Sequence, residues 1–146
     1  NVHLDQVTIT DCRPSGQGPV WTSAISGRPE SSLENITLTN LKIHYPGGGK
    51  KEEANVVPPY PKAYSPRDLG PRPASAFYIR HVEGLTIRKS EYTFDTPDQR
   101  PTLIGSDVDG LTPDTVKIQK PDVIQALRLE KVTNVKVNNC PGISTP

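Results

Sequence analysis

The sequence has little of what marks a membrane protein, a nucleic-acid-binding protein or a disulfide-rich domain. No apolar run approaches the roughly 18 residues that cross a bilayer as a helix, so we expect no membrane span. The 17 basic and 16 acidic residues leave a net charge of +1, which favours neither nucleic acid nor an anionic membrane as a partner. Methionine is absent and the chain starts at Asn1, from which we expect a processed chain or a segment of a longer protein.

A six-residue motif with alternating apolar positions recurs along the 146 residues. Its pattern is apolar, polar, Asn/Gln/Gly, apolar, Thr/Lys, and then apolar or Pro. Alternation is the period of a strand that buries one face, and Asn or Gly at the third position tolerates a left-handed backbone turn. The copies are Leu4–Ile9, Leu33–Leu38, Val82–Ile87, Val108–Pro113 and Val132–Val137.

The spacing of these copies predicts the architecture. They begin at residues 4, 33, 82, 108 and 132, so successive copies are 29, 49, 26 and 24 residues apart. A second short strand precedes the motif, as at Phe77 and Ile79, and a third follows it, as at Ser90 and Tyr92. Three short strands in each repeat, without helical periodicity, predict an all-β parallel β-helix of about five coils. An antiparallel β-sandwich is the alternative, but it has no reason to repeat one motif at a fixed phase.

The longest interval contains an irregular segment, Pro46–Pro73. Its 28 residues include seven prolines and the run Gly47-Gly48-Gly49. Proline cannot donate a hydrogen bond to a strand ladder, which argues against a central strand in this segment. Loops of this length serve a function or are disordered. We therefore expect one domain over residues 1–146, with 46–73 as a loop insertion within it.

The two cysteines are not expected to form a disulfide. Cys12 and Cys140 each stand eight residues after the start of a motif copy, in the first and the last coil. Strands stacked about 4.8 Å apart would separate them by roughly 19 Å over four steps, whereas a disulfide needs Cα atoms within about 7 Å. We predict two free, buried thiols.

Candidate catalytic groups are few. Asp107 and Asp109 form the kind of carboxylate pair that glycoside hydrolysis uses, but Asp109 occupies the solvated second position of the motif, which favours a structural role. The histidines His3, His44 and His81 lack metal-ligand spacing and are expected at the surface or in turns. No serine or cysteine lies in a nucleophile motif. We predict no catalytic residue, metal ligand or cofactor within the chain.

Three stretches resemble the late coils of bacterial glycoside hydrolase family 28, which includes polygalacturonases and rhamnogalacturonan hydrolases. They are Ile25–Gly49, with Glu34-Asn35-Ile36-Thr37-Leu38-Thr39-Asn40 at its centre, Ala76–Ile87, and Asp98–Leu111. The resemblance covers residues 1–111 and, more weakly, the remainder. It implies a right-handed parallel β-helix, a secreted or periplasmic location, and plant cell-wall polysaccharide of the pectin type as the partner.

The same family hydrolyses α-linked uronic-acid polymers with inversion, through Asn-Thr-Asp, Asp-Asp, Gly-His-Gly and Arg-Ile-Lys motifs. None of these four strings occurs in the sequence. The family places them N-terminal to the coils that this chain resembles. The resemblance therefore implies that this chain is the C-terminal part of a larger β-helix domain, that the N-terminal remainder of that helix is its partner, and that the chain alone is inactive.

Four residues of the insertion are candidates for substrate binding. Tyr60 and Tyr64 offer rings that can stack on sugar faces, and Arg67 and Arg72 can pair with a carboxylate. The alternative is that all four are loop residues held by local packing. The alternative function is a non-catalytic β-helix module that binds or displays polysaccharide, which the lack of catalytic motifs favours.

Overall fold

The computed structural model describes residues 2–5, 8–9, 21–61, 66–119 and 126–143, and for residues 2–5, 8–9, 66 and 67 the backbone alone. The described chain is all-β, with two parallel sheets. In the larger sheet the strands are ordered β1 (Val2–Asp5), β4 (Leu33–Thr39), β6 (Phe77–Arg88), β8 (Leu103–Asp114) and β10 (Leu127–Val135), and β3 (Ser23–Ser26) also pairs with β6. The smaller sheet is ordered β2 (Thr8–Ile9), β5 (Lys42–Gly47), β7 (Glu91–Thr96) and β9 (Lys117–Ile118).

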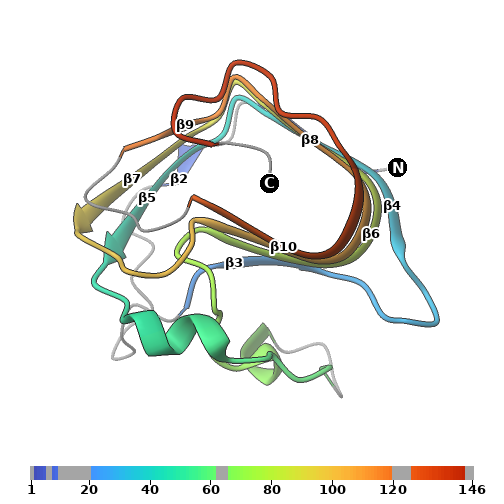
Figure 1. Ribbon diagram of the computed structural model, residues 1–146, viewed down its shortest axis with the longest axis horizontal. Coiled ribbons are helices and arrows are strands. Elements are labelled where there is room, and N and C mark those ends of the chain that lie inside the picture. Colours follow the sequence, from blue (N-terminus) through green and yellow to red (C-terminus); the bar gives the residue numbers. More distant parts are fainter. Residues whose placement is uncertain (1, 6–7, 10–20, 62–65, 120–125, 144–146) are drawn as a thin grey trace.

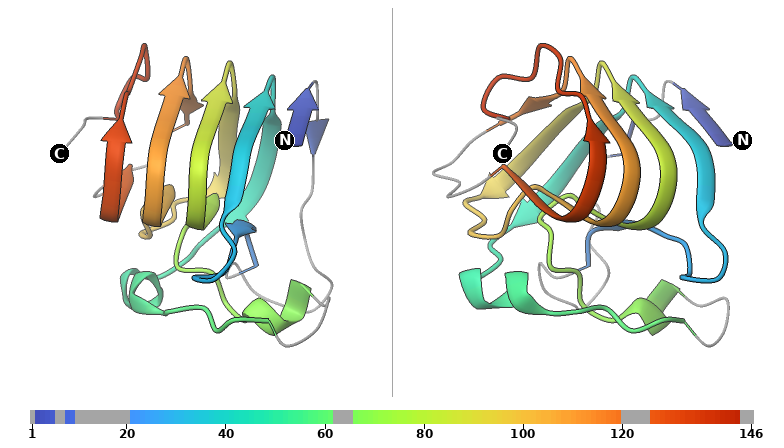
Figure 2. Two further views of the ribbon diagram at one scale, coloured as in Figure 1. Left: turned by 90° about the vertical axis from the view of Figure 1, so that its right-hand side faces the viewer. Right: turned by 45° about the vertical axis from the view of Figure 1, so that its right-hand side comes forward.

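Each strand lies beside the equivalent strand of the next repeat. The strands β4, β6, β8 and β10 lie one behind another in Figure 1 and side by side, in chain order, in Figure 2. The smaller sheet faces the larger one across an apolar interior, in which Ile79, Leu85, Ile87 and Leu111 have no exposed surface. The aromatic pairs Tyr45–Phe94 and Phe77–Tyr92, with ring centroids 5.8 and 5.7 Å apart, fill the space between the sheets.

The predicted repeat is confirmed for four of the five copies. Val82 pairs with Leu33 on one side and Val108 on the other, and Val108 pairs with Val132. The third motif position has a left-handed backbone in each of these copies, with φ of 52° at Asn35, 78° at Gly84, 78° at Gly110 and 54° at Asn134. The alternating residues therefore stack apolar on apolar, while Asn or Gly makes the turn.

The first copy lies in a different register from the predicted one. Leu4 pairs with Leu38 rather than with Leu33, and Ile9 pairs with Ile43. The chain from Val2 to Ile9 thus matches the second half of the next motif and the strand after it. The equivalence of Cys12 and Cys140 depends on the predicted register, which is wrong. Cys140 is free and buried, and Cys12 lies outside the described residues.

The strand predicted before the motif is not separate from it. β6 and β8 each run through twelve residues, and the ladder continues on both sides of the left-handed residue that directly precedes the motif, His81 in β6 and Asp107 in β8. Lys131 bends β10 in the same way, with φ of 53°. These three residues therefore form a column at one bend of the larger sheet.

The described part of the insertion contains regular structure. It contains two 3-10 helices, η1 (Lys51–Asn55) and η2 (Pro66–Leu69), and lies outside the sheets at the bottom of Figure 1. The strand β5 also runs through Pro46 to Gly47, contrary to the expectation from proline. Among the described residues β2 pairs only with Lys42 and Ile43, so on that side no described ladder bond needs the missing N–H of Pro46.

A buried ion pair fixes both ends of the insertion. Arg100 donates from Nη2 to Asp98 at 2.7 Å, and side chains of both residues are at most 2% exposed. The backbone N–H of Gly49 donates to Asp98, and Arg100 donates to the carbonyl of Arg72. A Cβ on Gly49 would lie 2.1 Å from Nε of Arg100, so the site requires glycine.

Within the described residues no helix is long and apolar enough to cross a membrane.

Candidate functional site

The insertion covers part of the outer face of the larger sheet and borders the first of two adjoining hollows on that face. The first, which we call the Tyr60 pocket, has a volume of about 510 Å³. Its lining comprises Val57, Pro58, Pro59, Tyr60, Tyr78, Arg80, His81, Ser106, Asp107, Glu130 and Lys131. The second, the corner pocket, has a volume of about 470 Å³. Its lining comprises Ser32, Val82, Glu83, Asp107, Val108, Asp109, Lys131 and Thr133. The two share Asp107 and Lys131, and we call them together the outer groove.

The strand ladder places the polar side chains of the groove in two columns. Arg80, Ser106 and Glu130 occupy one register position of β6, β8 and β10. His81, Asp107 and Lys131 occupy the next position, at the bend. Because parallel neighbours are about 4.8 Å apart, residues 24 to 26 positions apart in the sequence lie next to one another on this face.

Arg80 fastens the insertion to the sheet. Its guanidinium donates to Ser26 Oγ and to the carbonyls of Pro58 and Pro59, at 2.6 to 2.7 Å. It also lies 4.1 Å from the centre of the Tyr60 ring, a cation–π contact. Arg80 is 3% exposed, so its positive charge interacts with groups of the protein and not with solvent.

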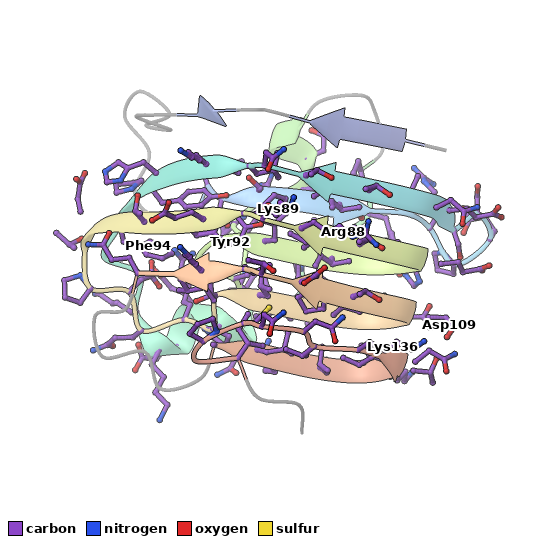
Figure 3. The ribbon with its side chains drawn as sticks, turned by 90° about the horizontal axis from the view of Figure 1, so that it is seen from above. Arg88, Lys89, Tyr92, Phe94, Asp109 and Lys136 are labelled. Carbon is purple, nitrogen blue, oxygen red and sulfur yellow. The ribbon has the colours of Figure 1, made fainter. Side chains whose placement is uncertain are left out.

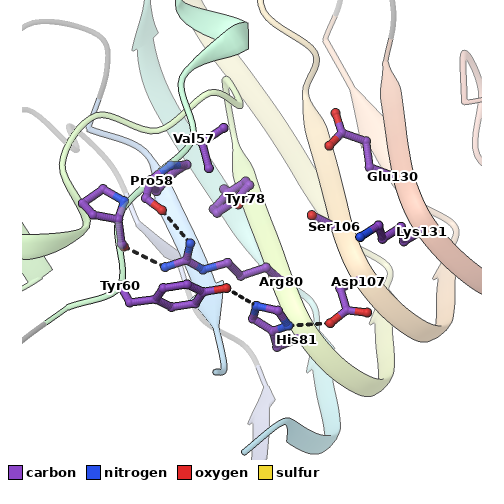
Figure 4. A pocket seen from close by; sticks show the side chains of 11 residues that line it. Val57, Pro58, Tyr60, Tyr78, Arg80, His81, Ser106, Asp107, Glu130 and Lys131 are labelled. Atoms are coloured by element: carbon purple, nitrogen blue, oxygen red, sulfur yellow. Dashed lines mark hydrogen bonds and ion pairs between the residues drawn. The ribbon is translucent and has the colours of Figure 1, made fainter. Parts of the chain in front are cut away.

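Tyr60, His81 and Asp107 form a chain of hydrogen bonds across the Tyr60 pocket (Figure 4). The Tyr60 hydroxyl lies 2.6 Å from Nε2 of His81, and Nδ1 of His81 lies 2.5 Å from Asp107. A carboxylate can only accept, so Nδ1 of His81 donates to Asp107; in the tautomer of a neutral imidazole that this bond selects, Nε2 accepts from the phenol. The order hydroxyl, imidazole, carboxylate is that of nucleophile-activating triads, but in this pocket it also holds the Tyr60 ring, 43% exposed, at the rim.

Asp109, in the corner pocket, accepts two hydrogen bonds from the next strand. Thr133 Oγ1 and Asn134 Nδ2 each donate to its Oδ1 at 2.6 Å. These bonds favour the ionised form and lower the pKa of Asp109. Glu83, its ladder partner in β6, pairs in turn with Glu34, as the motif predicts. In Figure 3 Asp109 lies at one edge of the molecule and Phe94 toward the other.

Of the four predicted binding residues, the two whose side chains the structure describes, Tyr60 and Arg72, do not line the same pocket. Tyr60 lines the groove, whereas Arg72 is buried, lies 5.1 Å from the Trp21 ring and lines neither pocket. Burial lowers the pKa of Arg72. Tyr64 and the side chain of Arg67 lie outside the described residues. Within the described part of the chain no three His, Cys, Asp or Glu side chains gather in a way that could hold a metal ion.

The sequence prediction missed the residues that the sheet contributes to the groove. His81 was expected at the surface or in a turn; it is at a bend, but 9% exposed. A usable signal exists, because His81, Asp107 and Lys131 each directly precede the apolar residue that starts a motif copy.

No protein-family model, curated protein sequence or solved structure matches the chain at a significant level.

Proposed function

We propose that the two sheets belong to a right-handed parallel β-helix of about five coils. Its support is the strand order, in which every described pairing between repeats is parallel and each repeat lies on the next in register. Left-handed residues recur at the same bends of successive repeats, as the corners of a coil require. Residues 1–146 would be one segment of that helix, with 46–73 as its insertion.

We further propose that the outer groove binds glycan, as part of a hydrolase similar to glycoside hydrolase family 28 that acts on pectin-type polysaccharide. The observation that carries this proposal is the Tyr60 ring, an exposed aromatic surface held over a hollow by His81 and Arg80. Rigid aromatic rings bind the apolar faces of sugars at small entropic cost. Val57, in the same pocket and 81% exposed, adds apolar surface.

In this proposal the chain binds the polysaccharide, and the residues that catalyse hydrolysis belong to another part of the same β-helix. None of the four catalytic strings of the resembled family is present, so acid and base would come from the N-terminal remainder of the same β-helix. The enzyme would act in a secreted or periplasmic setting, where cell-wall polysaccharide is accessible. The alternative is a non-catalytic module with the same groove, which the lack of those strings also supports.

Binding to pectin fragments tests the shared part of both proposals. We expect the chain to bind oligosaccharides derived from pectin in isothermal titration calorimetry, and Tyr60→Ala to weaken binding about tenfold, which corresponds to about 1.4 kcal/mol. His44→Ala on β5 is the control, because His44 contacts Thr93 and Asp95 in the smaller sheet. Equal binding by wild type and Tyr60→Ala would exclude this groove.

A second measurement separates the hydrolase from the module. Intact mass and N-terminal sequencing of the protein from its native source show whether Asp-Asp and Gly-His-Gly motifs precede Asn1. Their presence, with release of reducing ends from galacturonan or rhamnogalacturonan, supports the hydrolase. A native chain that starts at Asn1 and binds glycan supports the module.

A further inference from the structure

The charges that line the outer groove indicate which part of a pectin-type glycan it takes. We propose that the groove binds a neutral stretch, in which carboxyl groups are esterified or absent, and disfavours free polyuronate. This inference rests on the proposed glycan binding and specifies its ligand. It differs from what the family resemblance implies, which is a uronate-bearing substrate.

The corner pocket carries an excess of negative charge. Glu83, Asp107 and Asp109 contribute three carboxylates to its lining, against the single ammonium group of Lys131. The Tyr60 pocket adds Glu130, which is exposed on the same face and pairs with Arg128 Nε at 3.5 Å. Asp109 is held by Thr133 and Asn134 in a way that keeps it ionised. A polyanion laid along this groove would meet like charges at several successive positions.

The positive charges near the groove offset this excess only in part, because Arg128 pairs with Glu130 and, in the described lining, leaves the three carboxylates of the corner pocket opposed by Lys131 alone. Arg80 directs all three guanidinium nitrogens to Ser26, Pro58 and Pro59 and is 3% exposed, so it offers no free face to a ligand carboxylate. Lys131 is the only exposed cation in the described lining of the two pockets. It lies at the same bend as Asp107 and lines both pockets together with that carboxylate.

The same side chains suit a polyol. Carboxylate oxygens accept hydrogen bonds from sugar hydroxyls, and several fixed acceptors along a groove match a chain of hydroxyl donors. His81 holds Asp107 through one oxygen, and the side chain of Asp107 remains 58% exposed. Tyr60 and Val57 supply the apolar surface for C–H faces of the sugar rings.

A matched pair of ligands tests this inference. Oligogalacturonate of one length and its fully methyl-esterified form share one backbone and differ at the carboxyl groups, which are charged in the acid and neutral, with an added methyl group, in the ester. Both are titrated into the chain at low and high salt, because only an effect of charge depends on salt. We expect the ester to bind at least about tenfold more tightly. Added salt should strengthen binding of the acid by screening repulsion and leave the ester unchanged.

Variants assign the effect to the groove. Glu83→Gln combined with Asp109→Asn should narrow the gap in binding affinity between the acid and the ester. The double variant removes two of the four carboxylate charges that line the groove. The double variant should fold, since Glu83 and Asp109 are like charges opposite each other in the ladder. Glu91→Gln, on β7 of the smaller sheet, is the matched control and should leave the gap unchanged.

The outcomes separate this inference from the proposal beneath it. If the acid binds as tightly as the ester or better, and Lys131→Gln weakens it, the inference is overturned. Glycan binding stands in that case provided that Tyr60→Ala weakens the acid too. If neither ligand nor a neutral galactan oligosaccharide binds, both proposals are overturned.

Discussion

The phenol oxygen of Tyr60 lies 2.6 Å from Nε2 of His81, which joins the insertion to β6. The two rings are also stacked, with centroids 5.7 Å apart and an angle of 26° between their planes. Asp107, one strand further along, accepts from the other nitrogen of the same imidazole. One histidine therefore connects the aromatic ring of the insertion to two neighbouring strands of the larger sheet.

This arrangement predicts which nitrogen of His81 carries the proton. In long-range ¹H–¹⁵N spectra we expect the Nδ1–H tautomer in the wild type and in Tyr60→Phe, because Asp107 remains. In Asp107→Asn the preference should weaken, since an amide can also donate. Tyr60→Phe should keep the ring stack and lose about 1 kcal/mol of local stability, measured as faster amide exchange near residue 60. A wild-type Nε2–H tautomer would contradict donation from Tyr60 to His81 and from His81 to Asp107.

The parallel stacking could be predicted from the sequence because the motif carries two independent signals of it. Its alternation indicates a strand with one buried face, and Asn35, Gly84, Gly110 and Asn134 each mark a turn at the same position. The register predicted for the first copy is wrong because Val2 to Ile9 alternates as well as Leu33–Leu38 does. A six-residue pattern of period two fits such a segment at more than one offset.

The candidate site was harder to predict because its residues meet through the ladder and not through local sequence. Arg80, Ser106 and Glu130 are neighbours only once the register of β6, β8 and β10 is known. The contact of Tyr60 with His81 depends in addition on how the insertion folds back. Arg80 and the Asp98–Arg100 pair determine the path of the insertion. In a sequence, charged residues are ordinarily expected to be exposed to solvent, so these contacts were not apparent.

The Asp98–Arg100 pair predicts a large effect of a small substitution. Asp98→Asn should destabilise the fold by about 3–5 kcal/mol, since it leaves the buried Arg100 guanidinium without its counter-charge. Asp95→Asn is the control: Asp95 pairs with His44, its side chain is 40% exposed, and about 1 kcal/mol or less is expected. Urea unfolding followed by circular dichroism measures both. Similar losses in the two variants would contradict a structural role for the buried pair.

Two buried tyrosines of the interior should respond in opposite ways to the loss of their hydroxyl groups. Tyr45 hydrogen-bonds to Ser23 Oγ at 2.8 Å and donates to the Ala76 carbonyl at 3.3 Å, so Tyr45→Phe should cost about 1–2 kcal/mol. The Tyr92 oxygen has no hydrogen bond of normal geometry within the described part of the chain. Tyr92→Phe should therefore be neutral or stabilising. Urea unfolding at neutral pH measures both variants.

The buried hydroxyl group of Tyr92 predicts a loss of folding stability at alkaline pH. Burial, and then the neighbouring Tyr45, raise the pKa of Tyr92 far above its ordinary value, and Ser90 offsets this only in part. The folded pKa exceeds the unfolded pKa of about 10, so the contribution to stability is complete below pH 10 and declines above it. The decline should be at most about 1.4 kcal/mol per pH unit. It should be smaller in Tyr92→Phe, and identical alkaline slopes in the two proteins would contradict this assignment.

The carboxylate of Asp109 predicts an effect in acid. Thr133, and then Asn134, lower its pKa by hydrogen bonding, so its folded pKa lies below the unfolded one. Its contribution to stability is therefore present above the unfolded pKa of about 3.9 and is lost as the pH falls through the folded pKa. Thr133→Val should raise the pKa of Asp109 toward its ordinary value in an NMR titration of the side-chain carboxyl carbon. Thr112→Val on β8, whose side chain donates nothing to Asp109, should leave it unchanged; an equal rise in both variants would show that the Thr133 bond is not the cause.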